Sequence, residues 1–273
     1  MPEGDTIFRA AAGLRPYLVG RRVEDARANG PGPVPQVRRI VGREITAVDA
    51  LGKNLLIRFD NGLELRTHLR MKGVWHRYRP GERWHMPPSR ASLVLEVPGA
   101  VAVCFDAPVV ELLEQRAETL HEPLAGLGPD LLAPDFDAAE AIRRLHDPSR
   151  RGMTIGEALL DQRVMAGIGN VYRSEILWID GVSPFTPVED LDDATLERLV
   201  GTARRLLVAN ASGGRGFERV TTAGDRGAPG PLYVYRRVGR PCRRCRTAIA
   251  STRLGRELPR SVYWCPACQG PQP

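Results

Sequence analysis

Four cysteines near the carboxyl end constrain this chain more than any other feature. They fall as Cys242-x-x-Cys245 and Cys265-x-x-Cys268, with nineteen residues between the two pairs. Paired thiols at this spacing are typical of a structural zinc site, in which four thiolates surround one ion tetrahedrally. Because such a site leaves the metal no open position for water or a substrate, we expect one zinc ion that stabilises a small terminal ribbon.

The segment that carries these cysteines is strongly basic. From Arg236 to Arg260 it contains nine arginines and a single acidic residue, Glu257. A surface that served only solubility would mix charges of both signs, whereas phosphate binding explains an excess of one sign. The net charge of +7 and the pI of about 9.5 agree with a polyanionic partner. We therefore expect the partner to be nucleic acid.

Cysteine usage and hydropathy indicate the compartment. Cys104 lies in the apolar run 101–105 and is predicted to be a core residue, so the remaining four thiols belong to the metal motif. This usage is typical of a reducing compartment. No apolar stretch approaches the roughly 18 to 20 residues of a membrane span, and the first residues lack a secretory signal. We expect a cytoplasmic protein with no membrane partner.

Hydrophobic patterns predict an α+β multidomain chain of four parts. Residues 1–120 should form an N-terminal helix over 5–18, capped by Asp5 or Thr6, and a β-sandwich or barrel. Residues 121–135 are rich in proline and glycine and indicate a linker. Residues 136–230 should form a helical domain with a glycine-rich loop, and 231–273 the ribbon. The predicted strands are 44–50, 54–59, 63–68, 91–97 and 101–105, and the later helices are 137–145, 154–162, 170–178 and 191–209.

Pro2 is the first candidate for chemistry. Removal of Met1, which is usual before a small residue, would expose Pro2 as a terminal secondary amine. At neutral pH the unprotonated fraction of an α-amino group, with a reference pKa of about 7.8, is roughly 300-fold larger than that of lysine. A secondary amine that attacks a sugar carbon yields an iminium ion, which favours elimination. Many chains begin Met-Pro through processing alone, so the interpretation depends on companion residues.

Glu3 and Lys53 are the candidate companions. Glu3 could act as a general acid, although an acid near a helix start also complements the helix dipole. Only Lys53 and Lys72 are lysines among 39 basic residues, which singles out Lys53, placed after Gly52 at a turn. It is either an ordinary exposed turn lysine or a phosphate clamp or proton donor near the amine.

Two further segments suit nucleic-acid binding. In residues 166–170 two glycines lead into a helix for which Asn170 is the predicted cap, and such a helix start binds phosphate well. An ordinary turn between helices is the alternative. Residues 68–73 place Met71 between Arg70 and Lys72 on a predicted loop, a composition that suits opening a duplex while its backbone is held.

Together these motifs resemble the formamidopyrimidine-DNA glycosylase and endonuclease VIII superfamily, and the resemblance covers nearly the whole chain. Their order and spacing carry the resemblance more than any single motif. The start Pro-Glu-Gly-Asp is similar to the endonuclease VIII branch, and residues 106–110 carry no Arg-Phe-Gly wedge. The motifs are Met1-Pro-Glu-Gly-Asp-Thr6, Gly52-Lys53, His68 to Gly73, Gly167-Ile-Gly-Asn170 with Tyr172 and Glu175, and the cysteine ribbon.

The resemblance implies a bifunctional base-excision repair enzyme that acts on damaged double-stranded DNA. Its fold would combine an N-terminal helix and β-sandwich, a helix-two-turn-helix domain and a zinc ribbon. Pro2 would displace the damaged base and form a Schiff base, and Glu3 would be the acid. Lys53 would assist β-elimination.

The resemblance also implies which residues bind DNA. Asn170 and Arg260 would bind the phosphates that flank the lesion, with Arg260 also placed to support δ-elimination. Arg70, Met71 and Lys72 would fill the gap left by an extruded nucleotide, although two cations are unusual in that wedge. Oxidised pyrimidines are the expected substrates and a monomer associated with the nucleoid the expected state. The alternatives are the same chemistry on oxidised purines, or a zinc protein that binds DNA lesions without catalysis.

Overall fold

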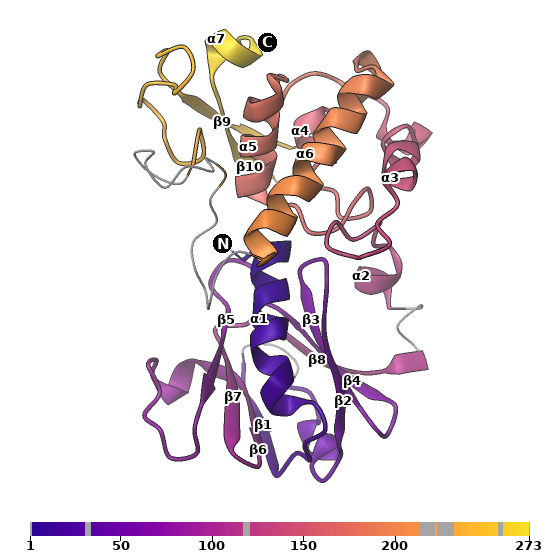
Figure 1. The fold of residues 1–273 in the computed structure, drawn as a ribbon, viewed down its shortest axis with the longest axis vertical. Helices are drawn as coiled ribbons and strands as arrows, with labels where there is room; N and C mark the ends of the chain where they lie inside the picture. The colour runs from indigo at the N-terminus through magenta and orange to yellow at the C-terminus, as the bar shows by residue number, and fades with distance from the viewer. Residues whose placement is uncertain are drawn as a thin grey trace. The chain divides into compact units, whose positions relative to one another are not determined.

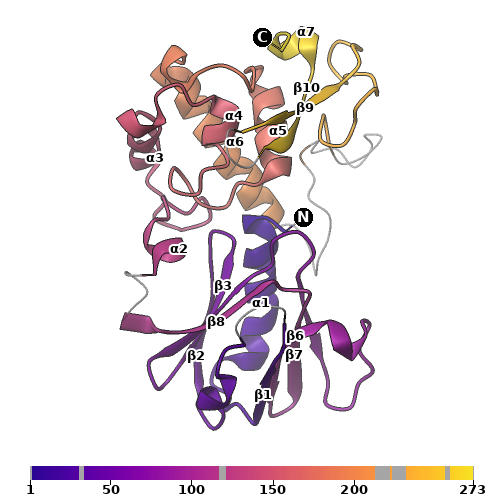
Figure 2. The same ribbon diagram turned by 180° about the vertical axis from the view of Figure 1, so that it is seen from behind.

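The structure is a computed structural model that describes residues 2–30, 34–116, 121–212, 222, 232–255 and 259–272. The chain divides into two compact units, Met1–Gly126 and Leu127–Pro273 (Figures 1 and 2). Met1 and nearly all of the glycine-rich loop predicted before residue 231 lie outside the described residues. Within the described ranges, no helix combines the length and the apolar character needed to cross a membrane.

Unit 1 begins with α1 (Gly4–Leu18), whose apolar face is buried as the sequence pattern predicts. Figure 1 shows this helix lying along the strands of the unit. The predicted cap is wrong, because Glu3 rather than Asp5 or Thr6 precedes the first helical residue. The main-chain oxygen of Glu3 accepts hydrogen bonds from the N–H groups of Thr6 (3.0 Å) and Ile7 (3.1 Å). Glu3 is thereby fixed at the helix start.

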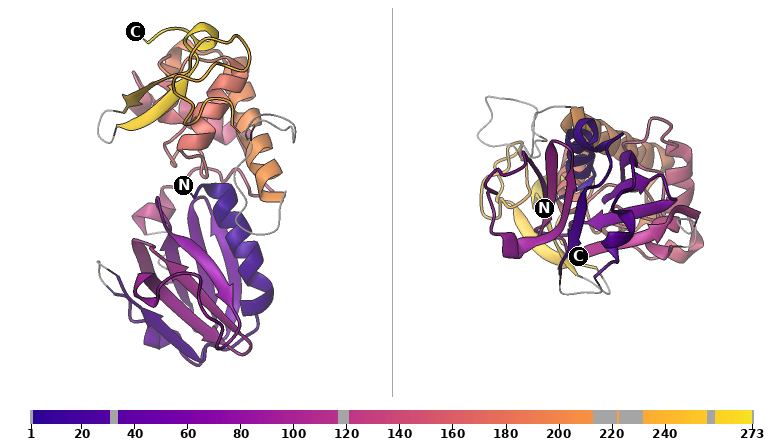
Figure 3. Two further views of the ribbon diagram at one scale, coloured as in Figure 1. Left: turned by 90° about the vertical axis from the view of Figure 1, so that its left-hand side faces the viewer. Right: turned by 90° about the horizontal axis from the view of Figure 1, so that it is seen from below.

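Eight strands of unit 1 form two antiparallel sheets, in the orders β1-β6-β7-β5 and β2-β3-β4-β8, stacked as a sandwich (Figure 3). One hydrophobic core joins α1 to both sheets, so the sandwich alternative is confirmed over the barrel. Short 3-10 helices occupy Val37–Ile40 and Pro88–Arg90, and α2 (Glu122–Ala125) follows the sandwich. The strands are β1 (Asp25–Ala28), β2 (Ile45–Leu51), β3 (Asn54–Phe59), β4 (Leu63–His68), β5 (Val74–Tyr78), β6 (Ala91–Val97), β7 (Ala100–Phe105) and β8 (Val109–Glu114).

The strand register brings three connections to one end of the sandwich. Asn54, which follows the β2–β3 turn, pairs with His68 at the end of β4. His68 in turn pairs with Val109 at the start of β8. Val74 at the start of β5 pairs with Phe105 at the end of β7. The β2–β3 turn, the β4–β5 loop and the β7–β8 turn are therefore neighbours.

Unit 2 has a helical core. The helix predicted over 154–162 is too long, since α4 ends at Ala158. The Gln162 side chain instead donates hydrogen bonds to the main-chain oxygens of Leu160 (2.9 Å) and Ile168 (3.0 Å) and so shapes the loop before α5. The elements are α3 (Ala138–Leu145), α4 (Ile155–Ala158), α5 (Asn170–Asp180) and α6 (Asp193–Ser212), with 3-10 turns at Pro148–Arg150 and Val188–Asp190.

The ribbon of unit 2 packs against α5. It consists of the antiparallel pair β9 (Ala250–Leu254) and β10 (Arg260–Trp264), followed by α7 (Pro266–Gln269). A small hydrophobic cluster joins Trp178 of α5 to Val234, Ile249 and two of the metal-motif cysteines. The metal motif therefore packs directly against α5.

Candidate functional site

The predicted nucleophile lies at the start of α1. Pro2 is half-buried and Glu3 is fully buried. The helix runs antiparallel to β2, because Arg15 donates to the main-chain oxygen of Val48 at 2.7 Å while Gly20, past the helix end, donates to that of Ile45 at 2.8 Å. The amino end of α1 therefore reaches the end of the sandwich where β2 turns into β3.

Lys53 occupies that turn. Gly52 and Lys53 form a two-residue loop between the paired residues Leu51 and Asn54, and Gly52 has φ of +57°. A positive φ at the first loop position is the arrangement in which a type II′ hairpin turn places glycine. The Asn54 side chain closes the turn by donating to the main-chain oxygen of Leu51 at 3.1 Å. Lys53 is half-buried, so it is not an ordinary exposed turn lysine.

A buried arginine stabilises this turn through Asn54. Arg66 of β4 donates to Oδ1 of Asn54 at 2.9 Å and to the carboxylate of Glu111 at 2.5 Å. Only 6% of Arg66 is exposed. Charge-assisted hydrogen bonds in a buried setting are strong, so the orientation of Asn54, and with it the Lys53 turn, is well determined.

The predicted wedge lies in the β4–β5 loop. Arg70, Met71 and Lys72 are all exposed, and 56% of Met71 is accessible despite its apolar side chain. Arg70 adopts a φ of +45°, which turns the chain sharply, and the N–H of Gly73 donates to the main-chain oxygen of Leu69 at 2.9 Å. The loop thus presents one apolar side chain between two cations at the same end of unit 1 as the amine.

His68 is a site residue that the sequence reasoning did not single out. Burial, together with the charges of Arg66, Lys53 and Arg70, lowers the pKa of His68 to about 4. Its Nδ1 accepts the N–H of Arg70 at 3.2 Å, so the neutral ring carries its proton on Nε2. The available signal was a histidine at the end of the predicted strand 63–68, where the 68–73 segment begins.

The β7–β8 turn carries an acidic residue in place of an aromatic wedge. Asp106 has φ of +50° and is bound by the guanidinium of Arg90, whose Nε lies 3.0 Å from each carboxylate oxygen. Hydrogen bonds from Arg90 lower the pKa of Asp106, and the charge of Lys72 lowers it further. The turn is short and fixed, and it places a negative charge near the basic wedge loop.

In unit 2, Asn170 is not the helix cap that the sequence predicts. Gly169 is the N-cap of α5 and Asn170 is the first helical residue. The Asn170 side chain donates to the main-chain oxygen of Ser261 at 2.7 Å, and its Oδ1 accepts a hydrogen bond of 2.6 Å from Arg173. Arg173 is fully buried and donates to the same Ser261 oxygen at 2.7 Å. Glycine suits the cap because no side chain obstructs the helix start.

This network brings two predicted phosphate ligands together. Arg260 is the first residue of β10, next to Ser261, and its side chain is exposed. The sequence separates Asn170 and Arg260 by 90 residues, yet Asn170 is hydrogen-bonded to Ser261, the residue that follows Arg260. Arg173 was missed by the sequence reasoning, although a charged residue inside an otherwise apolar helix is a usable signal.

Glu175, one turn further along α5, anchors the segment that leads into the ribbon. Its carboxylate accepts the main-chain N–H groups of Tyr233 (2.7 Å), Val234 (2.8 Å) and Tyr235 (2.8 Å), and also the hydroxyl of Thr222. Glu175 is fully buried. Three consecutive amides around one carboxylate fix the backbone of this segment against the helix.

The four predicted metal ligands converge. The sulfur atoms of Cys242, Cys245, Cys265 and Cys268 all lie within 4.8 Å of one another. A tetrahedral zinc site with bonds of about 2.3 Å requires sulfur–sulfur distances of about 3.8 Å. The separations of 3.4 Å for Cys245–Cys265 and 3.9 Å for Cys242–Cys268 fit that geometry. Trp178 donates its indole N–H to the Cys242 sulfur at 3.3 Å, which favours a thiolate.

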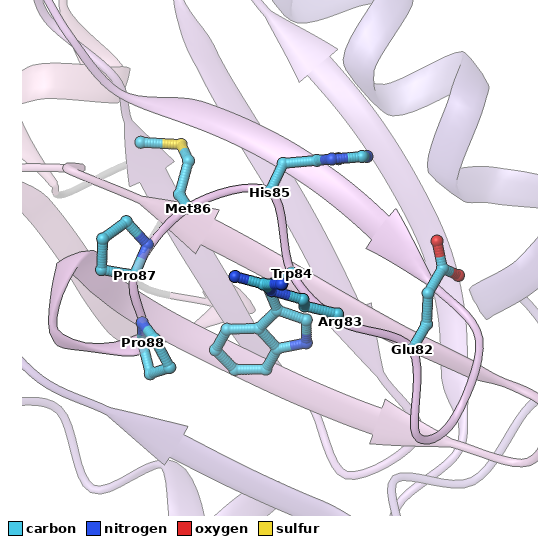
Figure 4. A pocket seen from close by; sticks show the side chains of 7 residues that line it. All are labelled: Glu82, Arg83, Trp84, His85, Met86, Pro87 and Pro88. Carbon is cyan, nitrogen blue, oxygen red and sulfur yellow. The ribbon is translucent and has the colours of Figure 1, made fainter.

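A separate hollow on unit 1 contains none of the predicted site residues. It has a volume of about 570 Å³ and is lined by residues 82–88 of the β5–β6 connection (Figure 4). The Trp84 ring stacks on Tyr78 at 6.0 Å between centroids and meets Phe105 edge-on at 5.7 Å. These aromatic contacts cover the face of the β1-β6-β7-β5 sheet that points away from the main core, so we assign this loop a structural role.

Comparisons with known proteins cover both units. Residues 1–108 match the formamidopyrimidine-DNA glycosylase N-terminal domain family, and residues 127–220 match the formamidopyrimidine-DNA glycosylase H2TH domain family. The chain is 41% identical to a probable endonuclease 8 2 of Streptomyces coelicolor, over 100% of this chain and 96% of that protein. It is 39% identical to the DNA-(apurinic or apyrimidinic site) lyase Nei2 of Mycolicibacterium smegmatis, over 98% and 99%.

A solved structure confirms the fold. The crystal structure of Lactococcus lactis Fpg in complex with DNA that contains an abasic site superposes with a TM-score of 0.81, covering 98% of this chain and 99% of that one. The two chains share 20% sequence identity, so the agreement concerns the fold alone. The predicted helix and β-sandwich, helical domain and cysteine ribbon are all confirmed.

Proposed function

The chain belongs to the formamidopyrimidine-DNA glycosylase and endonuclease VIII family, and on that premise we propose that it excises oxidised bases, preferably pyrimidines, through an N-terminal proline Schiff base. It is a DNA glycosylase and abasic-site lyase of base excision repair. We infer that it acts as a monomer on genomic DNA in the cytoplasm.

One observation supports this chemistry best. The half-buried Pro2, the buried carboxyl of Glu3 and the half-buried Lys53 belong to segments that meet at one end of unit 1. An amine, an acid and a second amine in one place are the groups that base displacement and elimination need. A protein that only bound DNA lesions would gain nothing from this set.

In the proposed reaction the Pro2 nitrogen attacks C1′ of the damaged nucleotide, and the base leaves with the electrons of the glycosidic bond. The nitrogen loses its proton, Glu3 donates a proton to the ring oxygen, and the sugar opens to a cationic Schiff base. The iminium withdraws electrons, so removal of a C2′ proton expels the 3′ phosphate. Lys53 assists that proton transfer, and Arg260 supports the later loss of the 5′ phosphate.

The nucleotide must leave the helix for this attack. An amine cannot reach C1′ of a stacked and paired nucleotide, and extrusion costs a few kcal/mol, less for a damaged base. Met71 then occupies the vacated space while Arg70 and Lys72 hold the backbone, which accounts for an exposed methionine between two exposed cations. Asn170 and Arg260 bind the phosphates beside the lesion.

The preference for oxidised pyrimidines rests on the β7–β8 turn. Asp106 is locked by Arg90 in a short turn that offers no aromatic or basic side chain to the opposite base. Excision of thymine glycol, dihydrouracil and oxidised guanine from matched duplexes tests this preference. We expect both pyrimidine lesions to be removed at least several-fold faster than oxidised guanine, and the reverse order would reject the preference without affecting the chemistry.

Borohydride trapping tests the chemistry itself. With a lesion-containing duplex, the processed protein should form a covalent adduct whose mass identifies Pro2 as the attachment point. Pro2→Gly and protein that retains Met1 should form none, whereas Arg116→Gln, an exposed residue of unit 1, should trap normally. Adduct formation in all four proteins would remove Pro2 from the mechanism, and binding without any adduct would indicate a non-catalytic lesion-binding protein.

We further propose that the cysteine cluster holds one structural zinc ion. When bound, the ion would stabilise the ribbon, since structural zinc sites in small peptides contribute roughly 10 to 16 kcal/mol of apparent binding energy. Metal analysis should find one zinc per chain, and Cys265→Ser should lose it and bind DNA more weakly. Cys104→Ser, at a buried thiol outside the cluster, should retain the metal. Unchanged DNA affinity in Cys265→Ser would show that the ribbon does not contribute to DNA binding.

A further inference from the structure

The loop that carries the first two cysteines is unusually rich in arginine. Residues 236–246, here named the knuckle segment, contain six arginines and no acidic residue. Four of them are exposed. These four are Arg236, Arg240, Arg244 and Arg246.

The charges of these four side chains are not neutralised locally. Among the residues that the structure describes, no carboxylate oxygen lies within 4.0 Å of any of them. Arg240 and Arg246 make no side-chain hydrogen bond within the same ranges. Some exposed arginines elsewhere are paired with acids, such as Arg143 with Glu140 (2.7 Å) and Arg163 with Asp161 (2.9 Å). The knuckle segment is therefore a local excess of positive charge.

The backbone that carries these arginines is held in place by several contacts. Arg244 lies over the Trp178 ring at 4.5 Å and donates to the main-chain oxygen of Ile179 at 3.1 Å. The N–H of Arg246 donates to the main-chain oxygen of Cys242 at 3.0 Å, and Ile249 donates to that of Arg240 at 2.9 Å. Cations on a fixed backbone lose less conformational entropy on binding than cations on a mobile tail.

The knuckle segment is distant from the predicted lesion contacts within unit 2. Arg244 binds the carboxyl end of α5, whereas Asn170 begins that helix, and nine residues at 1.5 Å each separate them by about 14 Å. The four steps of β10 from Arg260 to Trp264, which precedes the second cysteine pair, give a similar separation of roughly 13 Å.

We propose that the knuckle segment is a second phosphate-binding surface, which holds the backbone of duplex DNA independently of any lesion. Its contribution is to the affinity for undamaged DNA and to the salt dependence of binding, and it takes no part in the chemistry. Nucleic acid is favoured over an acidic protein because protein interfaces need a buried apolar centre. Val238 is the one exposed large apolar residue that the described part of the segment offers.

The double variant Arg240→Gln/Arg246→Gln tests the proposal. Both side chains are exposed and make no hydrogen bond or ion pair with another described residue, so the fold and the metal site should be preserved, as zinc content and melting temperature will verify. The matched control is Arg38→Gln/Arg39→Gln, an equal loss of two exposed charges from unit 1. A charge-preserving variant, Arg240→Lys/Arg246→Lys, separates charge from side-chain shape.

Fluorescence anisotropy with an undamaged 30-base-pair duplex across a salt series provides the readout. Each lost phosphate contact should lower the slope of log K against log salt by about 0.9, so we expect the Gln variant to lose about one to two units. The control and the Lys variant should keep the wild-type slope.

Equal slopes for wild type and the Gln variant, or equal losses in the Gln variant and the control, would overturn the proposal. If the Gln variant keeps the wild-type salt slope with DNA but loses binding to an acidic protein, the surface would be assigned to such a protein partner instead. The outcome is independent of the proposed chemistry, because undamaged DNA cannot form a Schiff base. A protein that fails to trap DNA with borohydride but shows the expected slope change would retain this surface and lose the glycosylase mechanism.

Discussion

The side-chain amide of Asn170 donates a hydrogen bond of 2.7 Å to the main-chain oxygen of Ser261. This bond joins the first residue of α5 to the strand that begins with Arg260. Arg173 completes a triangle, because it donates to both Asn170 and Ser261. The Asn170 side chain and the main chain next to Arg260 are thus held together before DNA arrives, which reduces the entropic cost of binding a rigid backbone.

Replacing Asn170 by Ala should weaken both the fold and DNA binding. Two hydrogen bonds are lost at about 1 kcal/mol each, so the free energy of unfolding should fall by about 2 kcal/mol. Affinity for a duplex with an abasic-site analogue should fall on the order of 10- to 100-fold, measured by anisotropy. Arg260→Gln, at an exposed side chain, should weaken binding without changing the melting temperature. If Asn170→Ala binds DNA normally, the phosphate role of Asn170 is wrong.

Replacing Glu175 by Ala should release the segment that leads into the ribbon. Three main-chain N–H groups would lose their acceptor, and each buried unsatisfied donor costs roughly 1 to 3 kcal/mol. Hydrogen exchange of the amides of residues 233–235 should accelerate strongly, whereas Glu140→Gln, in an exposed ion pair, should leave it unchanged. Slow exchange in Glu175→Ala would mean that other contacts hold the segment.

Stability should depend on pH through His68. Its pKa is lowered to about 4 in the folded protein, below the ordinary value of about 6.5, so the unfolded chain binds more protons between these values. Stability therefore rises with pH from about 4 to 6.5 and levels off above that window. Urea unfolding at pH 5 and pH 7 should show a smaller difference in His68→Gln than in wild type or His146→Gln. An unchanged difference would contradict the lowered pKa.

Two glycine substitutions should have opposite effects. A Cβ on Gly73 would lie 2.8 Å from the Cα and the main-chain oxygen of Leu69, so Gly73→Ala must displace the wedge loop. We expect a loss of about 1 to 3 kcal/mol in unfolding free energy and slower single-turnover excision. Gly201→Ala, in the exposed face of α6 with no atom within 4 Å, should stabilise by about 0.5 to 1 kcal/mol. Normal excision by Gly73→Ala would show that the loop tolerates displacement.

The strands of unit 1 that the sequence did not predict share a position in the fold, although the edge strand β2 was predicted. β1, β5 and β8 all lie at sheet edges, where only one neighbour contributes and polar side chains dilute the alternating pattern. The central strands β3, β4, β6 and β7 were predicted within one residue because their buried runs are continuous. The helix over 154–162 was overextended because Gln162 hydrogen-bonds to loop backbone that the local pattern does not reveal.

The sequence by itself determined the family, the cysteine cluster and the list of candidate residues, because spacing and order along a chain are visible without a fold. Only the tertiary structure decided that Asn170 is bound to Ser261, that Arg173 and Glu175 are fully buried and paired, and that His68 lies beside Lys53. The reason is physical. The partner of a buried polar group is set by strand register and helix packing across tens of residues, and no local pattern encodes that distance.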